Sequence, residues 1–146
     1  MQYTRHAILR CISYVTYNQY RMKDAGVVKN ILVVEDISNL RLLMRNQLGE
    51  DGYHIHGVEG GVDALRMLKN RPDIELVILD IHLPDMNGLD MLEKLRSANE
   101  NMKVLIISGY ATPENIIRAK KLNVEAFFTK PIDWNGLRKK VKELLG

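Results

Sequence analysis

Three carboxylates follow two apolar runs of the chain. Glu35 and Asp36 come directly after the run 31–34, and Asp80 comes directly after the run 76–79. If both runs are parallel strands of one sheet, their C-terminal ends lie at the same edge, and the three side chains meet in one crevice. Carboxylates held so close raise one another's pKa or recruit a hard cation, and an open site of oxygen atoms suits Mg²⁺. We therefore expect a magnesium site at this edge.

Two more polar side chains end apolar runs in the same way. Ser108 follows the run 104–107, and Lys130 follows the run 126–129. If these runs belong to the same sheet, its edge combines carboxylates with a hydroxyl and an ammonium group. Positioning and neutralisation of charge are what phosphoryl transfer requires of a protein. The combination therefore indicates a site that handles phosphoryl groups.

The elements that would position these residues alternate along the chain. From residue 29 onward, short apolar runs alternate with stretches of helical periodicity, which is typical of a parallel sheet covered by helices on both faces. The pattern predicts a doubly wound α/β fold with five strands. The predicted strands are 31–35, 54–58, 76–80, 104–108 and 126–129.

Helical stripes and end signals support the same prediction. Gly52 stands where a helix C-terminal cap is expected, and Thr112 followed by Pro113 is typical of a helix start. Two stretches carry an apolar stripe at helical spacing, which should face the sheet. The stripes are Leu40, Leu43, Met44 and Leu48, and Leu137, Val141, Leu144 and Leu145.

Composition narrows the class of protein. The chain has 146 residues, enough for one domain with a real core, and its single cysteine, Cys11, excludes an intramolecular disulfide and a cysteine-based zinc site. No apolar stretch approaches the roughly 20 residues that span a bilayer. The net charge of +3 is concentrated in residues 1–28, so the remainder is neutral and direct DNA binding is a weak hypothesis. We expect a protein of the cytoplasm.

Residues 1–28 do not follow the alternation of strands and helices. Ile8, Cys11, Ile12 and Val15 are spaced as one face of a helix, so an appended helix is one interpretation. The other is an upstream extension without function, because Met22 could start a complete domain. We therefore divide the chain into an N-terminal extension, 1–28, and a domain, 29–146.

The order of these polar residues resembles that of a bacterial response-regulator receiver domain, the phosphoacceptor module of two-component signalling. The resemblance covers about residues 29–146 and implies a flavodoxin-like (βα)5 fold. It rests on Glu35 with Asp36, Asp80 followed by Leu83, Pro84, Asp85, Met86, Asn87 and Gly88, Ser108 with Gly109, Phe127, and Lys130 with Pro131.

The resemblance implies a role for each site residue. Asp80 would accept a phosphoryl group from a phosphohistidine on a sensor histidine kinase or a histidine phosphotransfer protein. Lys130 and the hydroxyl of Ser108 would contact phosphoryl oxygens. The expected magnesium ligands are Asp36, Asp80 and the backbone carbonyl of His82, together with Glu35 acting directly or through water. Glu35 replaces the aspartate often found first in the acidic pair.

Four positions would shape the response to phosphate. Ser108 and Phe127 occupy the places of a switch, in which the aromatic ring turns inward when the hydroxyl moves toward phosphate. His82 and Tyr110 stand two residues beyond Asp80 and Ser108, where such domains tune the lifetime of the phosphate. We expect the bulky Tyr110 to shield the acyl phosphate from water.

The predicted function is a stand-alone receiver that is not an enzyme in the usual sense, although it assists its own aspartyl phosphorylation and hydrolysis. Because the chain ends just after the fifth helical stretch, its output should be a contact with a downstream protein, unless it is a fragment of a longer regulator. One alternative is an interaction module that works without phosphate. A less favoured one is a haloacid-dehalogenase-like phosphatase, which needs a second aspartate where His82 stands.

Taken singly, the same residues also have structural interpretations. An acidic residue after a strand is commonly a helix N-cap, which applies to Glu35 and Asp36. Asp80 alone could cap or turn the chain, Ser108 could simply end a strand, and Phe127 could be ordinary core. Their joint placement at four strand ends favours a functional site.

Overall fold

The computed structural model describes residues 27–146, and the helix predicted within residues 1–28 lies almost entirely outside them. Five strands form one parallel sheet in the order β2-β1-β3-β4-β5. The strands are β1 (Asn30–Val34), β2 (His54–Val58), β3 (Ile74–Leu79), β4 (Lys103–Ser108) and β5 (Ala126–Thr129).

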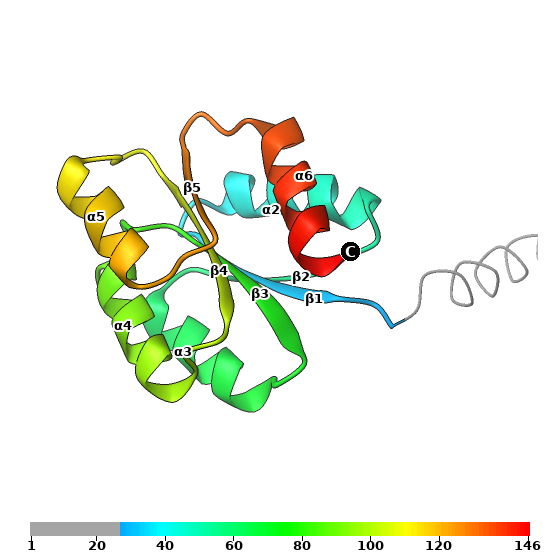
Figure 1. Cartoon of the computed structure of the whole chain (residues 1–146). Helices are drawn as coiled ribbons and strands as arrows, with labels where there is room; N and C mark the ends of the chain where they lie inside the picture. Colours follow the sequence, from blue (N-terminus) through cyan, green and yellow to red (C-terminus); the bar gives the residue numbers. More distant parts are fainter. Residues whose placement is uncertain (1–26) are drawn as a thin grey trace, which may run out of the picture.

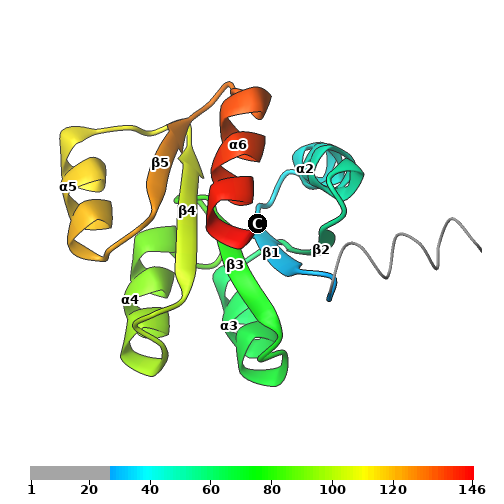
Figure 2. The ribbon, with the colours of Figure 1, turned by 45° about the vertical axis from the view of Figure 1, so that its right-hand side comes forward.

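Helices cover both faces of this sheet, as Figures 1 and 2 show. One face packs against α3, α4 and α5, and the other against α2 and α6. This arrangement confirms the predicted doubly wound α/β fold. The helices are α2 (Ser38–Glu50), α3 (Gly61–Asn70), α4 (Gly88–Ala98), α5 (Pro113–Lys121) and α6 (Trp134–Leu145).

The central strands β1, β3 and β4 are mostly apolar because both of their faces are covered. In β1, Leu32 and Val34 pack into the core beneath α3, α4 and α5, whereas Ile31 and Val33 pack beneath α2 and α6. Successive side chains of a strand point to opposite faces, so a strand buried on both sides needs apolar residues at every position. The polar residues of the site therefore stand at the C-terminal ends of the strands or just beyond them.

Element ends differ from the prediction by one or two residues. β1 ends at Val34 rather than at Glu35, and β3 ends at Leu79 rather than at Asp80. The predicted stripe of α2 was wrong at one position: Met44 and Leu48 are fully buried, but Leu43 is 47% exposed. Each residue advances a helix by about 100°, so the face toward the sheet does not extend to Leu43.

The predicted helix end signals are confirmed. Gly52, just after α2, has a φ of 93°, a left-handed conformation that glycine adopts without strain. Thr112 caps α5, since its side chain accepts a hydrogen bond from the backbone N–H of Asn115. Within residues 27–146, no helix is both long and apolar enough to cross a membrane.

Candidate functional site

Strand order brings the predicted site residues to one edge of the sheet. β1 pairs with β2 on one side and β3 on the other, so the chain reverses its direction of progress across the sheet at β1. Such a switch point leaves a crevice at the C-terminal ends of the strands. Three backbone hydrogen bonds fix the site residues to the neighbouring strand: Glu35 N–H to Val58 O at 3.1 Å, Asp80 N–H to Val34 O at 3.0 Å, and Lys130 N–H to Ser108 O at 3.0 Å.

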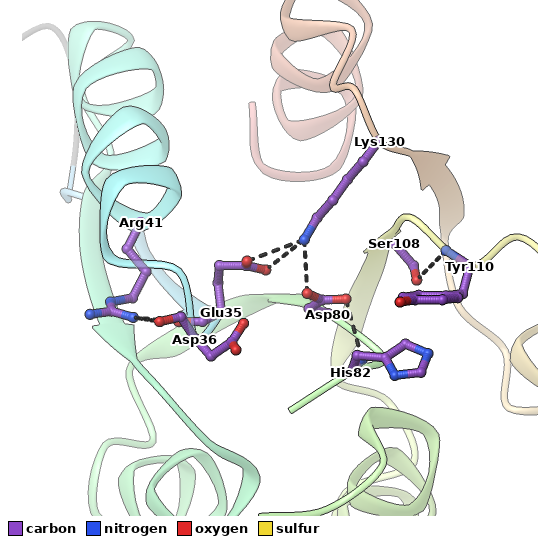
Figure 3. Close-up of polar contacts among 8 residues, drawn as sticks. All are labelled: Glu35, Asp36, Arg41, Asp80, His82, Ser108, Tyr110 and Lys130. Atoms are coloured by element: carbon purple, nitrogen blue, oxygen red, sulfur yellow. Dashed lines mark hydrogen bonds and ion pairs between the residues drawn. The ribbon is translucent and has the colours of Figure 1, made fainter. Parts of the chain in front are cut away.

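The three carboxylates meet in this crevice, as Figure 3 shows. Glu35, Asp36 and Asp80 each offer an oxygen, and these oxygens all lie within 4.8 Å of one another. Glu35 and Asp80 are buried, whereas Asp36 is exposed. The spacing would let one cation contact all three residues. Within residues 27–146, this is the one group of at least three acidic, histidine or cysteine side chains with such spacing.

Lys130 reaches into the cluster from the end of β5 (Figure 3). Its Nζ lies 2.8 Å from Asp80 Oδ2 and 3.1 and 3.2 Å from the two carboxylate oxygens of Glu35. Burial disfavours the charge of Lys130, but bonding to the two carboxylates and their charges outweigh it and raise the pKa of Lys130. The lysine therefore stays cationic and holds Glu35 and Asp80 together.

Glu35 responds to the crowding of negative charge. Burial raises the pKa of Glu35 from 4.5 to about 7, and Asp80 adds to the rise through a side-chain hydrogen bond and through repulsion. The charge and hydrogen bond of Lys130 oppose the rise without cancelling it. One lysine is thus insufficient to keep the pKa of Glu35 at its ordinary value. A second cation would complete the balance.

Ser108 lies at the same edge and is fully buried. Its Oγ accepts a hydrogen bond of 3.0 Å from the backbone N–H of Tyr110. A hydroxyl has one donor and two acceptor positions, so this bond leaves its proton available for another acceptor. Ser108 is therefore oriented by the backbone that follows β4.

Tyr110 and His82 form a pair of rings beside the cluster (Figure 3). Their centroids are 3.7 Å apart with an interplanar angle of 43°, and Tyr110 is 55% exposed. The backbone N–H of His82 lies 3.4 Å from Asp80 Oδ1. The two predicted tuning positions therefore touch one another. Phe127, the predicted switch position, is half-buried and packs beside the core beneath α3, α4 and α5.

The loop between β3 and α4 is closely packed around Asp80. The backbone N–H of Gly88 bonds to Ile81 O at 2.6 Å. A Cβ at Gly88 would lie 2.1 Å from the carbonyl oxygen of Asp80, so the loop can pass here only without a side chain. Asp85 bonds to the backbone N–H groups of Gly61 and Val62, both at 2.9 Å. The loop is thereby attached to the start of α3.

The helix-capping interpretation of the acidic pair is not supported. The N-cap of α2 is Ile37, and no side-chain hydrogen bond caps this helix. Glu35 instead faces Lys130, and Asp36 contributes to the cluster of three carboxylates. Both residues therefore point toward the crevice rather than toward the helix.

One residue of the site region was missed by the sequence analysis. Arg41, in α2, donates to the backbone carbonyls of Glu35 and Asp36 at 2.6 and 3.0 Å (Figure 3). An arginine near a helix start carries no distinctive signal in a sequence, because exposed arginines are common there. The contacts of Arg41 with the two carbonyls are found only in the tertiary structure.

Comparison with known proteins identifies the family. A family model described as response regulator receiver domain matches residues 31–142. The chain belongs to this family, the receiver domains of two-component response regulators. It is similar to sporulation initiation phosphotransferase F of Bacillus subtilis, with 33% identity over 118 residues that cover 80% of this chain and 94% of the relative. Receiver domains of this kind are signalling modules.

Solved structures give the same result. A CheY-like receiver domain protein from Methanospirillum hungatei superposes on this chain with a TM-score of 0.76 at 30% identity. The match covers 80% of this chain and 93% of the Methanospirillum chain. The response regulator TrrA from Thermotoga maritima, solved in complex with Mg²⁺-BeF, superposes with a TM-score of 0.73 at 31% identity, covering 81% of this chain and 100% of its own. An acidic cluster is thus present here in a fold whose relatives include a magnesium complex.

Proposed function

We propose that this protein is a phosphorylation-activated receiver, in which Asp80 accepts a phosphoryl group in the presence of Mg²⁺. The observation that carries the proposal is the meeting of Glu35, Asp36 and Asp80 within 4.8 Å, with Lys130 bonded to two of them. The donor would be a phosphohistidine on a sensor histidine kinase or a histidine phosphotransfer protein.

The charges of the site support a divalent cation. If all three carboxylates are ionised, they and one lysine carry a formal charge of about −2, which a divalent cation would balance. Among residues 27–146, no hydrogen bond or ion pair occupies the Asp36 carboxylate, so its oxygens face the crevice unengaged. Bound there, Mg²⁺ would neutralise the charge of the incoming phosphoryl group. Glu35, Asp36, Asp80 and the backbone carbonyl of His82 would be its ligands.

The chain's own residues would perform the transfer. An Asp80 carboxylate oxygen would attack phosphorus, a new O–P bond would form, and the P–N bond to the donor imidazole would break, leaving its electron pair on nitrogen. The ammonium of Lys130 would hold one phosphoryl oxygen. The hydroxyl of Ser108 would donate its available hydrogen to another. Water would later cleave the acyl phosphate and restore the free carboxylate.

The signal would leave the site through Ser108 and Phe127. Movement of Ser108 toward phosphate would open space beside β4, and the half-buried ring of Phe127 would turn into it. Phe127 lies on β5, where it is the register partner of Ile106 on β4. The surface around α5, β5 and α6 would change and a downstream protein would bind it.

The test is a mass measurement on intact protein. Wild type and Asp80→Asn are incubated with acetyl phosphate or phosphoramidate and Mg²⁺, with a matched sample in EDTA. We expect one added phosphate in wild type with Mg²⁺ and none in the other samples. Absence of the adduct in wild type would contradict the proposal and favour an interaction module that works without phosphate. An adduct of equal yield in Asp80→Asn would place the phosphoacceptor elsewhere.

A further inference from the structure

The side chain of Arg41 runs back from α2 to the loop that carries the acidic pair. Its Nη1 donates to Glu35 O at 2.6 Å and to Asp36 O at 3.0 Å, and its Nη2 lies 3.3 Å from Glu59 Oε1. The side chain is 19% exposed. A planar guanidinium with several fixed donors can hold such a set of acceptors at once, whereas an ammonium cannot match its geometry.

The hydrogen bonds of Arg41 hold the short loop between β1 and α2 in place. The backbone N–H of Glu35 already bonds to Val58 O in β2, so with Arg41 both polar groups of the Glu35 backbone are engaged. The N-cap of α2, Ile37, follows the acidic pair directly and supplies no capping side chain to hold the loop. One arginine thus holds the backbone carbonyls of both residues that offer carboxylate oxygens from this loop to the cluster.

The neighbouring strand leaves room for this side chain. Gly57 of β2 faces the aliphatic part of Arg41, and a Cβ at Gly57 would lie 3.2 Å from Arg41 Cδ. That distance is tighter than ordinary van der Waals contact, so a methyl group would require the stem of the arginine to shift by a few tenths of an ångström. Gly57 thus approaches the stem of Arg41, and Glu59 pairs with its guanidinium group.

We infer that Arg41 is a positioning residue for the metal site: it fixes the backbone of Glu35 and Asp36 so that their carboxylates can share one Mg²⁺. The inference rests on the proposed function, since it presumes a cation at the acidic cluster. Residues that orient metal ligands without touching the metal typically contribute about 10- to 100-fold in metal affinity.

Positioning and charge predict opposite results for the loss of Arg41. If the arginine acted only as a nearby positive charge, its removal would make the crevice more negative and Mg²⁺ would bind more tightly. If it positions the loop, its removal would let the carboxylates separate and Mg²⁺ would bind more weakly. The sign of the change in affinity therefore decides between the two roles.

The experiment is a calorimetric titration of the full chain with MgCl₂ for wild type, Arg41→Ala, Arg41→Lys and Arg45→Ala. Arg45 is the matched control, because it lies one turn further along α2 and is exposed, and its replacement by alanine removes the same charge. We expect the dissociation constant for Mg²⁺ to rise about 10-fold in Arg41→Ala. We expect a similar rise in Arg41→Lys, which keeps the charge but not the fork, and no rise in Arg45→Ala.

A further variant keeps the inference testable if Arg41→Ala folds poorly, and a second measurement separates Mg²⁺ affinity from phosphorylation. Gly57→Ala retains the arginine and its charge but crowds its stem, so it should also weaken Mg²⁺ binding, by less than the loss of the arginine. Phosphorylation by acetyl phosphate at saturating Mg²⁺ should return to the wild-type level in the Arg41 variants, because only the affinity for the ion is impaired.

The outcomes separate the inference from the proposed function. If wild type does not bind Mg²⁺, both are overturned. If wild type binds Mg²⁺ and Arg41→Ala binds it equally or more tightly, the inference alone is overturned. A loss of the same size in Arg45→Ala would also overturn it, because the effect would then be one of general charge.

Discussion

Glu35 is almost fully buried, yet it lies among two other carboxylates and a lysine, so its ionisation depends on what else is bound. Its pKa is raised to about 7, chiefly by burial and then by Asp80. The folded chain therefore holds this proton more tightly than the unfolded chain does. By linkage, the contribution of Glu35 to stability is fully present below its ordinary pKa and is lost as pH rises through the raised value.

A substitution tests this residue directly. In EDTA, we expect the free energy of unfolding of wild type, relative to Glu35→Gln, to fall by up to about 3 kcal/mol between about pH 5 and about pH 8. The measurement is urea denaturation followed by circular dichroism at each pH. Saturating Mg²⁺ should reduce the fall, because the cation stabilises the ionised form. A constant difference between the two proteins across this range would contradict the assigned ionisation.

The ring of Tyr110 is expected to limit the access of water to the acyl phosphate on Asp80. Its ring packs against His82 with a centroid distance of 3.7 Å. We expect Tyr110→Ala to speed hydrolysis of the acyl phosphate by up to about tenfold, equivalent to about 1.4 kcal/mol of barrier. Tyr110→Phe is the control and should keep the wild-type rate, because the ring rather than the hydroxyl provides the cover. Loss of the phosphate adduct followed by mass gives the rate, and equal lifetimes in wild type and Tyr110→Ala would reject the prediction.

At the scale of elements, the start of α3 is capped from another part of the chain. Its N-cap residue, Gly60, has no side chain to accept a hydrogen bond, and Asp85 from the β3–α4 loop bonds to the first two backbone N–H groups of the helix. A Cβ at Gly60 would lie 2.7 Å from Asp85 Oδ1. The glycine and the aspartate thus depend on each other, and their contact joins α3 to the loop that follows Asp80.

This cap predicts a response to substitution and to acid. We expect Asp85→Ala to lower the free energy of unfolding by about 1 kcal/mol, the usual worth of a helix cap. The bonds from Val62 and Gly61 hold the pKa of Asp85 below its ordinary 3.8, so its contribution is present above that value and is lost as pH falls through the lowered pKa. Urea denaturation at neutral and acid pH checks both points, with Asp85→Asn as the uncharged control.

Asp85 both caps α3 and joins it to the β3–α4 loop. A capping side chain at position 60 separates these two contributions. In the Asp85→Ala background, Gly60→Ser has room for its side chain and should restore the stability of α3. The same Gly60→Ser change in wild type should be destabilising, because its Cβ would meet the Asp85 carboxylate. A gain in stability from Gly60→Ser in wild type would contradict the packing described here.

At the scale of the whole molecule, the site is a junction between distant parts of the chain. Lys130 and Glu35 are 95 positions apart and directly follow β5 and β1, the last and first strands of the sheet in the sequence. The acidic cluster exists only when β1 and β3 are paired, so a cation that needs all three carboxylates binds the folded state alone. Binding of that kind stabilises the entire domain.

Thermal unfolding tests this coupling. We expect Mg²⁺ at about 100 times its dissociation constant to stabilise wild type by about 2.7 kcal/mol, seen as a rise in Tm. The circular dichroism transition should stay single, because the cation links strands from both halves of the sheet. Asp80→Asn should show a much smaller rise. An equal rise in both proteins would mean that the stabilising magnesium binds elsewhere.

Much of this protein was determined by its sequence. Strands buried on both faces are expected to be apolar, so residues that carry chemistry are expected at their ends. For that reason the apolar runs before Asp36, Asp80, Ser108 and Lys130 could be recognised as strands from the sequence. The division of the chain at residue 28 stays a prediction, since the described residues begin at 27.

Only the tertiary structure decided how the side chains are paired. Nothing in the local sequence shows that Arg41 reaches back to two carbonyls, that Asp85 caps a helix 23 and 24 positions earlier, or that Lys130 bonds to Glu35 as well as to Asp80. Periodicity reports which face of an element is buried, because burial depends on one residue at a time. Pairing depends on the separation of two residues in space, which exists only after the strands have taken their order in the sheet.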